Sequence, residues 1–199
     1  MKTFKSTELL EQLQADVRQL ILSANCLKSI DPELLMQQPA PNKWSVVQVL
    51  EHLNSYGRYY LLVIEKSLQK NKPAVEFFKP GWLGNYFTRL MKPGENGIVI
   101  NKMQSPKDHR PGKDLDIFPV LNAFLEQQQY LLDLLELAKT KNIGSIRTPI
   151  SISRFIQLKV GDTFRFLIAH EQRHFVQINN TLSAVKEVTG ISPVIHLAM

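Results

Sequence analysis

The stretch DTFRFLIAHEQRHFVQINNTLSAVK, residues 162–186, carries apolar residues at helical spacing and places two histidines among them. Residues four positions apart lie on one face of a helix. A single stripe therefore carries, in order, Leu167, His170, His174, Ile178 and Leu182. The two imidazoles occupy positions that packing normally gives to aliphatic side chains, so we expect them to point inward. The stretch predicts a helix that Asp162 caps, that reaches about Lys186, and whose histidines can bind one metal ion.

Three further segments have helical periodicity. The first runs from Leu9 to Leu27. The second opens on a capping-box signature, Ser45 followed by Gln48, and reaches about Lys70. The third runs from Ile117 to Ala138. Four amphipathic helices of this kind predict an all-α fold, a four-helix bundle, in a single domain over residues 1–199.

Residues 71–113 form one long crossover between the second and third of these helices. The crossover is rich in proline and glycine, and we expect a short helix near residues 86–91. Elsewhere, only residues 151–155 are expected to be extended. Bundles build metal sites from side chains on facing helices, and the second helix carries a third histidine, His52, at the border of its apolar stripe.

The charge of the chain is concentrated in the crossover. The formal net charge is +6, yet residues 66–113 hold ten Lys or Arg against three acids, and the rest is nearly neutral. Cys26 is the single cysteine, which excludes an intrachain disulfide and a cysteine-based zinc site; its apolar neighbours predict a buried thiol. The polar N-terminus and the short apolar runs predict a cytoplasmic protein without a transmembrane segment.

The residues 170–174 also satisfy the zincin pattern H-E-x-x-H, in which Glu171 would be the general base of a metalloprotease. No histidine follows at metzincin spacing, and Glu187 is the only later acid that could serve as a ligand. We therefore favour His52 as the third ligand. Three buried imidazoles without partners would cost on the order of 1–3 kcal/mol each, which favours a shared metal or hydrogen-bond network.

Two segments, KWSVVQVLEHL (43–53) and FLIAHEQRHFVQI (166–178), together resemble the DinB-like family of metal-binding four-helix proteins. The resemblance implies an up-down-down-up bundle, a divalent cation held by His52, His170 and His174, and frequent homodimers. It also implies a thiol transferase, isomerase or hydrolase-like activity on a small molecule. Imidazole ligands suit zinc, nickel, iron or copper, with zinc and nickel expected first. A low-molecular-weight thiol, anionic at the metal, is the expected cosubstrate.

For several other residues the sequence allows more than one interpretation. Tyr56 lies one turn from His52 and either lines the pocket or packs in the core. Glu171 is either a carboxylate behind a ligand or an interhelical or surface acid, and Gln177 either orients a ligand ring or is a packed, hydrogen-bonded amide. His109 is expected to be a solvated loop histidine, and His196 to be structural or exposed.

The crossover interleaves aromatic and basic side chains. It is either a solvated loop, a substrate lid, a nucleic-acid-binding surface or a membrane-surface element. As a lid, it would pack Trp82 or Tyr86 on the bundle and present Lys79, Arg89, Lys92 or Arg110 to an anionic substrate.

The sequence predicts a metal-dependent enzyme that activates a thiol or water for transfer or hydrolysis. The alternatives are a non-catalytic, stress-related metal-binding protein and a nucleic-acid-binding module, with nucleic acid the less favoured partner.

Overall fold

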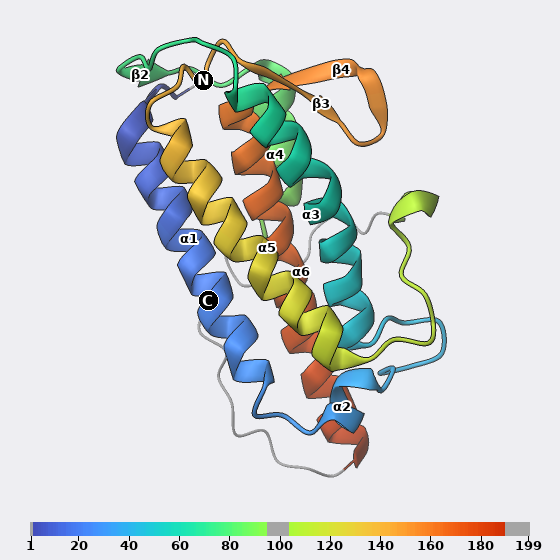
Figure 1. Ribbon diagram of the computed structural model, residues 1–199. Coiled ribbons are helices and arrows are strands. Elements are labelled where there is room, and N and C mark those ends of the chain that lie inside the picture. The colour runs from blue at the N-terminus through green and yellow to red at the C-terminus, as the bar shows by residue number, and fades with distance from the viewer. Residues whose placement is uncertain (1, 95–103, 190–199) are drawn as a thin grey trace.

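Four long helices form the body of the protein. The computed structural model describes residues 2–94 and 104–189. Figure 1 shows α1 and α6 running in one direction and α3 and α5 in the other, which is the up-down-down-up arrangement that the sequence predicts. Each of α1 and α3 packs against both α5 and α6. The elements in chain order are β1 (Phe4–Lys5), α1 (Ser6–Leu27), α2 (Pro32–Met36), α3 (Val46–Leu68), β2 (Phe77–Phe78), α4 (Trp82–Met91), the 3₁₀ turn η1 (Lys107–His109), α5 (Ile117–Ala138), β3 (Arg147–Ile150), β4 (Ser153–Lys159) and α6 (Val160–Thr189).

The start of α3 is fixed by the predicted capping box. The Ser45 side chain accepts a hydrogen bond from the backbone N–H of Gln48, and the Gln48 side chain accepts one from the backbone N–H of Ser45. Both residues are buried. Reciprocal capping of this kind satisfies two of the free N–H groups at a helix start. It sets the rotation of the next turns, and therefore the direction in which His52 points.

The start of α6 differs from the prediction. The helix begins at Val160, directly after β4, and Asp162 is not its cap. Asp162 is buried, and its carboxylate accepts hydrogen bonds from the backbone N–H of Gly81 at 2.7 Å and from Arg165 at 3.1 Å. It therefore attaches the start of α4 to α6 rather than capping a helix.

The antiparallel hairpin of β3 and β4 is the largest feature that the sequence did not predict. Only residues 151–155 were expected to be extended, whereas the strands cover residues 147–150 and 153–159. Strand-like alternation is weak here because the register is irregular between Pro149 and Ile150, and the neighbouring Phe155 and Ile156 are both exposed. Thr148, Ile150 and Leu158 are buried, and Phe155 is fully exposed.

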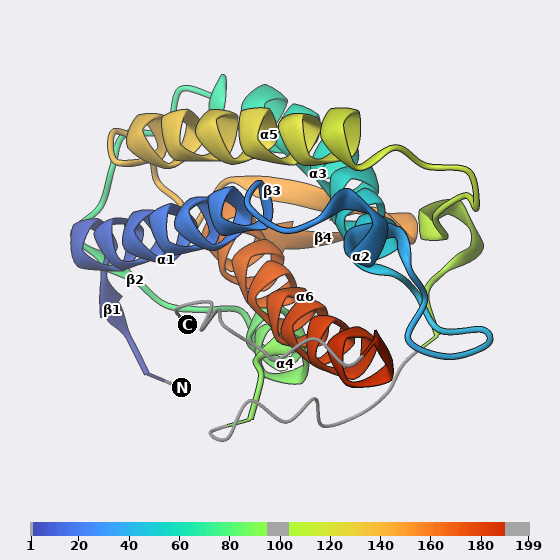
Figure 2. The same cartoon turned by 90° about the horizontal axis from the view of Figure 1, so that it is seen from below.

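The crossover contains the predicted short helix, α4, which packs along α6 (Figure 2). Phe87 of α4 meets Phe166 of α6 with ring centroids 6.1 Å apart. Cys26, expected to be buried, is exposed on α1, because it lies just off the apolar stripe formed by Ala24 and Leu27. In the described part of the chain, no helix is long and apolar enough to cross a membrane.

Candidate metal centre

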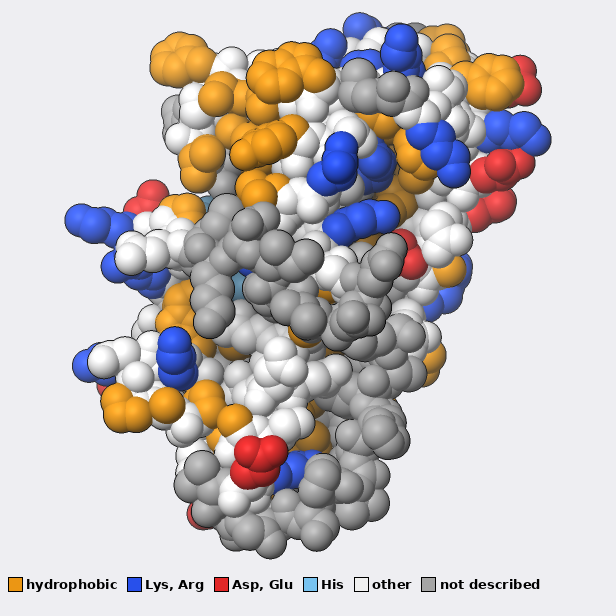
Figure 3. Space-filling model, turned by 180° about the vertical axis from the view of Figure 1, so that it is seen from behind, with side chains coloured by type: hydrophobic (Ala, Val, Ile, Leu, Met, Phe, Trp, Pro, Cys, Tyr) orange, Lys and Arg blue, Asp and Glu red, His pale blue; other side chains and the backbone are white. Residues whose placement is uncertain are grey.

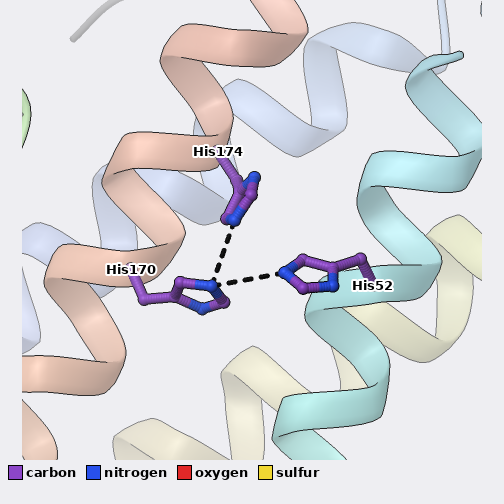
Figure 4. A group of neighbouring side chains, drawn as sticks. All are labelled: His52, His170 and His174. Carbon is purple, nitrogen blue, oxygen red and sulfur yellow. Dashed lines mark hydrogen bonds between the residues drawn. The ribbon is translucent and has the colours of Figure 1, made fainter. Parts of the chain in front are cut away.

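Three histidine side chains meet between α3 and α6. Figure 4 shows the rings of His52, His170 and His174 pointing toward one another. The Nε2 atom of His170 lies 3.3 Å from Nε2 of His52 and 3.0 Å from Nε2 of His174. One ligand atom from each residue lies within 4.8 Å of the others. His52 and His170 are buried, and His174 is partly exposed.

His52 is held by the crossover. Its Nδ1 lies 2.7 Å from the backbone carbonyl oxygen of His109. A carbonyl oxygen only accepts, so the His52 Nδ1 carries the proton and Nε2 keeps its lone pair. The hydroxyl of Ser105 lies 3.2 Å from the same carbonyl oxygen and 3.4 Å from His52 Nδ1.

His174 is held by its own helix. Its Nδ1 donates a hydrogen bond of 2.8 Å to the Oε1 atom of Gln177. This contact fixes the ring so that the Nε2 lone pair faces His170, as a residue that orients a ligand ring would do. The position of Gln177 therefore agrees with the prediction that it orients a ligand ring.

The three imidazoles are neutral at ordinary pH. Burial lowers the pKa of His52 to about 4 and that of His174 to about 3. Burial, together with the neighbouring histidines, puts the pKa of His170 well below its usual range. Uncharged imidazole is the form that binds metals.

The donor set fits a cation better than it fits a closed hydrogen-bond network. Two lone pairs, from His52 and His174, converge on Nε2 of His170, and a single N–H there can serve only one of them. Among the described residues, Nδ1 of His170 has no hydrogen-bond partner. A divalent cation between the three Nε2 atoms would satisfy all of them, and three nitrogen ligands are a familiar zinc-binding set.

Aromatic rings pack around the three histidines. The Tyr56 ring lies 5.1 Å from the ring centroid of His52, 4.5 Å from that of His170 and 3.9 Å from that of His109, on which it stacks. Trp44 packs against His52 at 5.0 Å, and Phe166 stacks on His170 at 6.1 Å. Tyr56 is thus both a packed residue and a wall of the site.

His109 was expected to be a solvated loop residue, and this expectation is wrong. The side chain is buried, and its Nδ1 donates to the Ser55 hydroxyl at 2.9 Å, while that hydroxyl donates to the His52 carbonyl at 2.7 Å. The sequence showed an Asp-His-Arg-Pro loop and no periodicity that could place it. His196 lies outside the described residues.

The zincin reading has no support in this arrangement. Glu171 is buried, and its Oε1 accepts a hydrogen bond of 3.0 Å from Gln128 of α5. Burial raises the pKa of its carboxyl to about 8. Glu171 is therefore an interhelical contact, the second of its two readings. Glu187 is exposed and lies thirteen residues after His174.

The structure separates the proposed lid residues. Arg110 directly follows His109, and its Nε donates to the Ser105 carbonyl at 3.1 Å, whereas Lys92 is exposed at the end of α4. Trp82 and Tyr86 are 74% and 56% exposed, so neither packs on the bundle as a lid would require. Lys79 and Arg89 are exposed too, and the backbone carbonyl of Lys79 accepts a hydrogen bond from the Lys159 side chain. The part of the crossover that reaches the histidines is residues 105–109, around η1.

A cavity of about 350 Å³ adjoins the first turn of α3. Gln48, which lines it, lies one helical turn before His52 on the same helix, and its side-chain amide donates to the Gly112 carbonyl at 3.1 Å. The lining residues are Met36, Gln38, Asn42, Ser45, Val47, Gln48, Lys113 and Leu115.

The chain resembles a known protein in its fold and a known family in its sequence. No curated protein matches the sequence. The fold is similar to the solved structure of YfiT from Bacillus subtilis, with a TM-score of 0.50 and 15% sequence identity. The match covers 94% of this chain and 87% of the YfiT chain. YfiT is described as a probable metal-dependent hydrolase with an unusual four-helix bundle topology. The sequence model of the DinB superfamily matches residues 9–178, a span that contains all three histidines, so the chain belongs to the DinB superfamily.

Proposed function

We propose that His52, His170 and His174 hold one divalent cation and that the protein is a metal-dependent hydrolase of small molecules. The observation that carries the proposal is the convergence of three Nε2 atoms, two of them with lone pairs fixed by hydrogen bonds at the opposite ring nitrogen. A divalent cation held by three imidazoles leaves coordination positions open and lowers the pKa of a bound water to about 7.

The surrounding residues would keep this donor set in place. The His109 carbonyl and Gln177 hold the tautomers of His52 and His174, and partners of this kind are worth roughly 10- to 100-fold in metal affinity. The rings of Trp44, Tyr56 and Phe166 exclude bulk water from the buried side of the three histidines. Imidazole donors suit zinc and nickel, which are the cations that we propose.

The reaction class draws on the relationship to YfiT, a protein described as a probable metal-dependent hydrolase. Membership of the DinB superfamily and the three histidines support the same reading. A thiol bound in place of water would instead give a transferase, because a metal-bound thiol loses its proton. The two chemistries use the same cation and differ only in the second reactant.

The cavity next to α3 is where we place the rest of the substrate. Lys113 lines it from the crossover side, and Gln48 lines it from the helix that carries His52. A carboxylate or phosphate on the substrate would find its countercharge at Lys113. In this proposal Lys113 has the role predicted from the sequence for Lys79, Arg89, Lys92 or Arg110.

The test begins with the purified protein, stripped with a chelator and titrated with zinc or nickel by calorimetry. We expect one site per chain, and its loss in His52→Ala, His170→Ala and His174→Ala, with Gln129→Leu, an exposed change on α5, as the matched control. The chelated protein should stay folded, because the apolar core does not depend on the cation.

Turnover is then measured on a panel of esters, amides and phosphoesters, and separately on electrophiles with added thiols. Cation-dependent hydrolysis without thiol supports the proposal. Turnover only with thiol would replace the hydrolase by a transferase. Stoichiometric binding with no turnover on either panel, and unfolding upon chelation, would show that the cation is structural.

A further inference from the structure

Helix α4 has one face packed against the bundle and one solvent-exposed face that carries aromatic side chains. Gly84, Thr88 and Met91 are buried against the bundle. Trp82, Tyr86 and Arg89, at positions i, i+4 and i+7, share the opposite face of the helix. Trp82 is 74% exposed and Tyr86 56% exposed. Within the described residues, this face of α4 stays exposed to solvent.

The β3–β4 hairpin presents further apolar groups beside this helix. Ile152 lies in the turn of the hairpin and is 64% exposed, and Phe155 lies near the start of β4 and is 99% exposed. Strand β4 contacts α4, and Lys159, at the base of the strand, donates to the Lys79 carbonyl. The hairpin register is irregular between Pro149 and Ile150, and the neighbouring Phe155 and Ile156 are both exposed. We call the exposed set Lys79, Trp82, Tyr86, Arg89, Ile152 and Phe155 the aromatic-basic patch.

The two segments that form the aromatic-basic patch carry positive charge alone. Neither residues 77–94 nor residues 143–161 contain an Asp or Glu. Asp162 contacts the start of α4 but is only 1% exposed. Its carboxylate accepts hydrogen bonds from the Gly81 backbone and from Arg165. Figure 3 shows large apolar side chains at the upper end of this face, where Figure 1 places α4 and the hairpin, with Lys and Arg side chains close beside them.

We propose that the aromatic-basic patch binds the surface of a membrane that contains anionic lipids. Tryptophan and tyrosine suit the boundary between headgroups and acyl chains, and lysine and arginine suit lipid phosphates. Phe155, 99% exposed near the end of the hairpin, would insert among the headgroups of such a surface. The protein would lie on the membrane without spanning it, with α4 parallel to the surface.

The proposal does not depend on the metal centre. The three histidines lie between α3 and α6, whereas the patch is formed by the outer face of α4 and the β3–β4 hairpin. Lipid binding would therefore survive the loss of all three histidines, and metal binding would survive the loss of the patch.

The experiment uses the full chain with vesicles of phosphatidylcholine containing about one third phosphatidylglycerol, and with vesicles of phosphatidylcholine alone. Co-sedimentation gives the partition constant, and tryptophan emission reports burial. The chain has two tryptophans, and Trp44 is already packed against His52, so a blue shift with anionic vesicles reports Trp82. The shift should disappear in Trp82→Phe, and added salt should weaken the binding.

Variants of the patch should each weaken binding to the anionic vesicles. We expect a loss of about tenfold in Trp82→Ser and in Phe155→Ser, and of about fivefold in Arg89→Ala. The matched controls are Phe118→Ser, an aromatic residue 60% exposed at the start of α5, and Lys28→Ala, which follows α1. Both lie at the opposite end of the bundle and should bind like the unaltered protein.

Three outcomes would overturn the proposal. The first is no binding to the anionic vesicles, and the second is equal loss in the patch variants and in the controls. The third is binding of another class of partner through the same residues. A dimer that Phe155→Ser dissociates in sedimentation velocity would assign the patch to a second copy of the chain, and a salt-sensitive mobility shift with single-stranded DNA, lost in Trp82→Ser, would assign it to nucleic acid.

Discussion

The backbone carbonyl oxygen of His109 accepts a 2.7 Å hydrogen bond from Nδ1 of His52, across 57 residues of sequence. This contact makes the crossover part of the proposed metal centre, because it decides which nitrogen of His52 faces the other two histidines. The side chain of His109 secures the contact by stacking on Tyr56 and donating to Ser55.

Replacing His109 should weaken metal binding although His109 is not a ligand. His109→Ala removes the stack and the hydrogen bond, so the carbonyl that holds His52 is no longer fixed. We expect the Kd for zinc to rise by about tenfold, at the lower end of the range for partners behind ligands. Calorimetric titration of the chelated protein measures it. Lys107→Ala, an exposed change in the same 3₁₀ turn, is the control, and an unchanged Kd in His109→Ala would contradict the prediction.

Gln177 offers a test with a conservative rescue. Gln177→Leu removes the acceptor for His174 Nδ1, and the Kd for zinc should rise by roughly tenfold or more. Gln177→Glu keeps a side-chain oxygen at the same place, so it should restore binding to the wild-type level or tighter. If the leucine and glutamate variants bind zinc equally, the contact does not orient the ring.

The buried Glu171 predicts a stabilising substitution. Its folded-state pKa, raised by burial to about 8, exceeds that of an unfolded glutamate. As the pH rises from about 4.5 to 8, the unfolded chain loses this proton first, so the free energy of unfolding falls. Within the described residues, Oε2 of Glu171 and Oε1 of Gln128 have no partners. Glu171→Gln removes the charge and offers an N–H to Gln128, and should stabilise the protein by on the order of 2 kcal/mol at pH 8 in urea unfolding.

The same variant separates the two readings of residues 170–174. A zincin would lose its activity with Glu171→Gln, because that glutamate would be its general base. Here the variant should keep its zinc affinity and its activity. A loss of activity without a loss of metal would restore the zincin reading.

The histidines predict the opposite dependence on pH for the chelated protein. The pKa of His52 is about 4 and that of His174 about 3 in the folded state, against about 6.5 in the unfolded chain. Below pH 6.5 the unfolded chain takes up protons that the folded chain refuses, so the free energy of unfolding falls as the pH falls. We expect roughly 1 kcal/mol per pH unit for each histidine between pH 6.5 and about 4. Above pH 6.5 both states are neutral and this contribution is constant.

Urea unfolding between pH 4.5 and 7 measures this slope. The variant His52→Phe should show a shallower slope than the unaltered chain. A slope that does not change in that variant would mean that His52 keeps an ordinary pKa when the cation is absent.

The attachment of α4 can be tested with a pair of glycines. A Cβ added at Gly84 would lie 2.4 Å from both Cβ and Cγ of Asp162, so something must shift. Gly84→Ala should therefore separate α4 from α6 and lower the free energy of unfolding by about 1–3 kcal/mol, the usual cost of overpacking. Gly112→Ala, with no atom within 4 Å of the added Cβ, should cost far less. Hydrogen exchange localised to residues 81–91 would show where the change acts.

The sequence predicts the bundle well because its signals are local and repeated. The stripes of α1, α3, α5 and α6 and the capping box at Ser45 each belong to one helix, and each helix appears close to its predicted limits. His52, His170 and His174 could be grouped because two of them share a stripe and the third lies on a neighbouring helix. Packing four stripes together then brings the three residues to one place.

What the sequence could not show are contacts between distant irregular segments. The burial of His109 depends on the path of the crossover, and no spacing rule connects that loop to His52. Asp162 looked like a helix cap because its local context allows one, yet its carboxylate attaches α4. Trp82 and Tyr86 looked like lid residues because they are aromatic, whereas the residues of their helix that are buried against the bundle are Gly84, Thr88 and Met91.

The histidines of the proposed metal centre leave the ribosome at very different times. His52 is synthesised in the first third of the described chain, the segment that holds its ring follows near residue 109, and His170 and His174 come on the last helix. A nascent chain that ends before α6 carries one ligand of the three, so it cannot capture a cation at this site. Metal loading would therefore report that synthesis has passed α6 and that the bundle has closed.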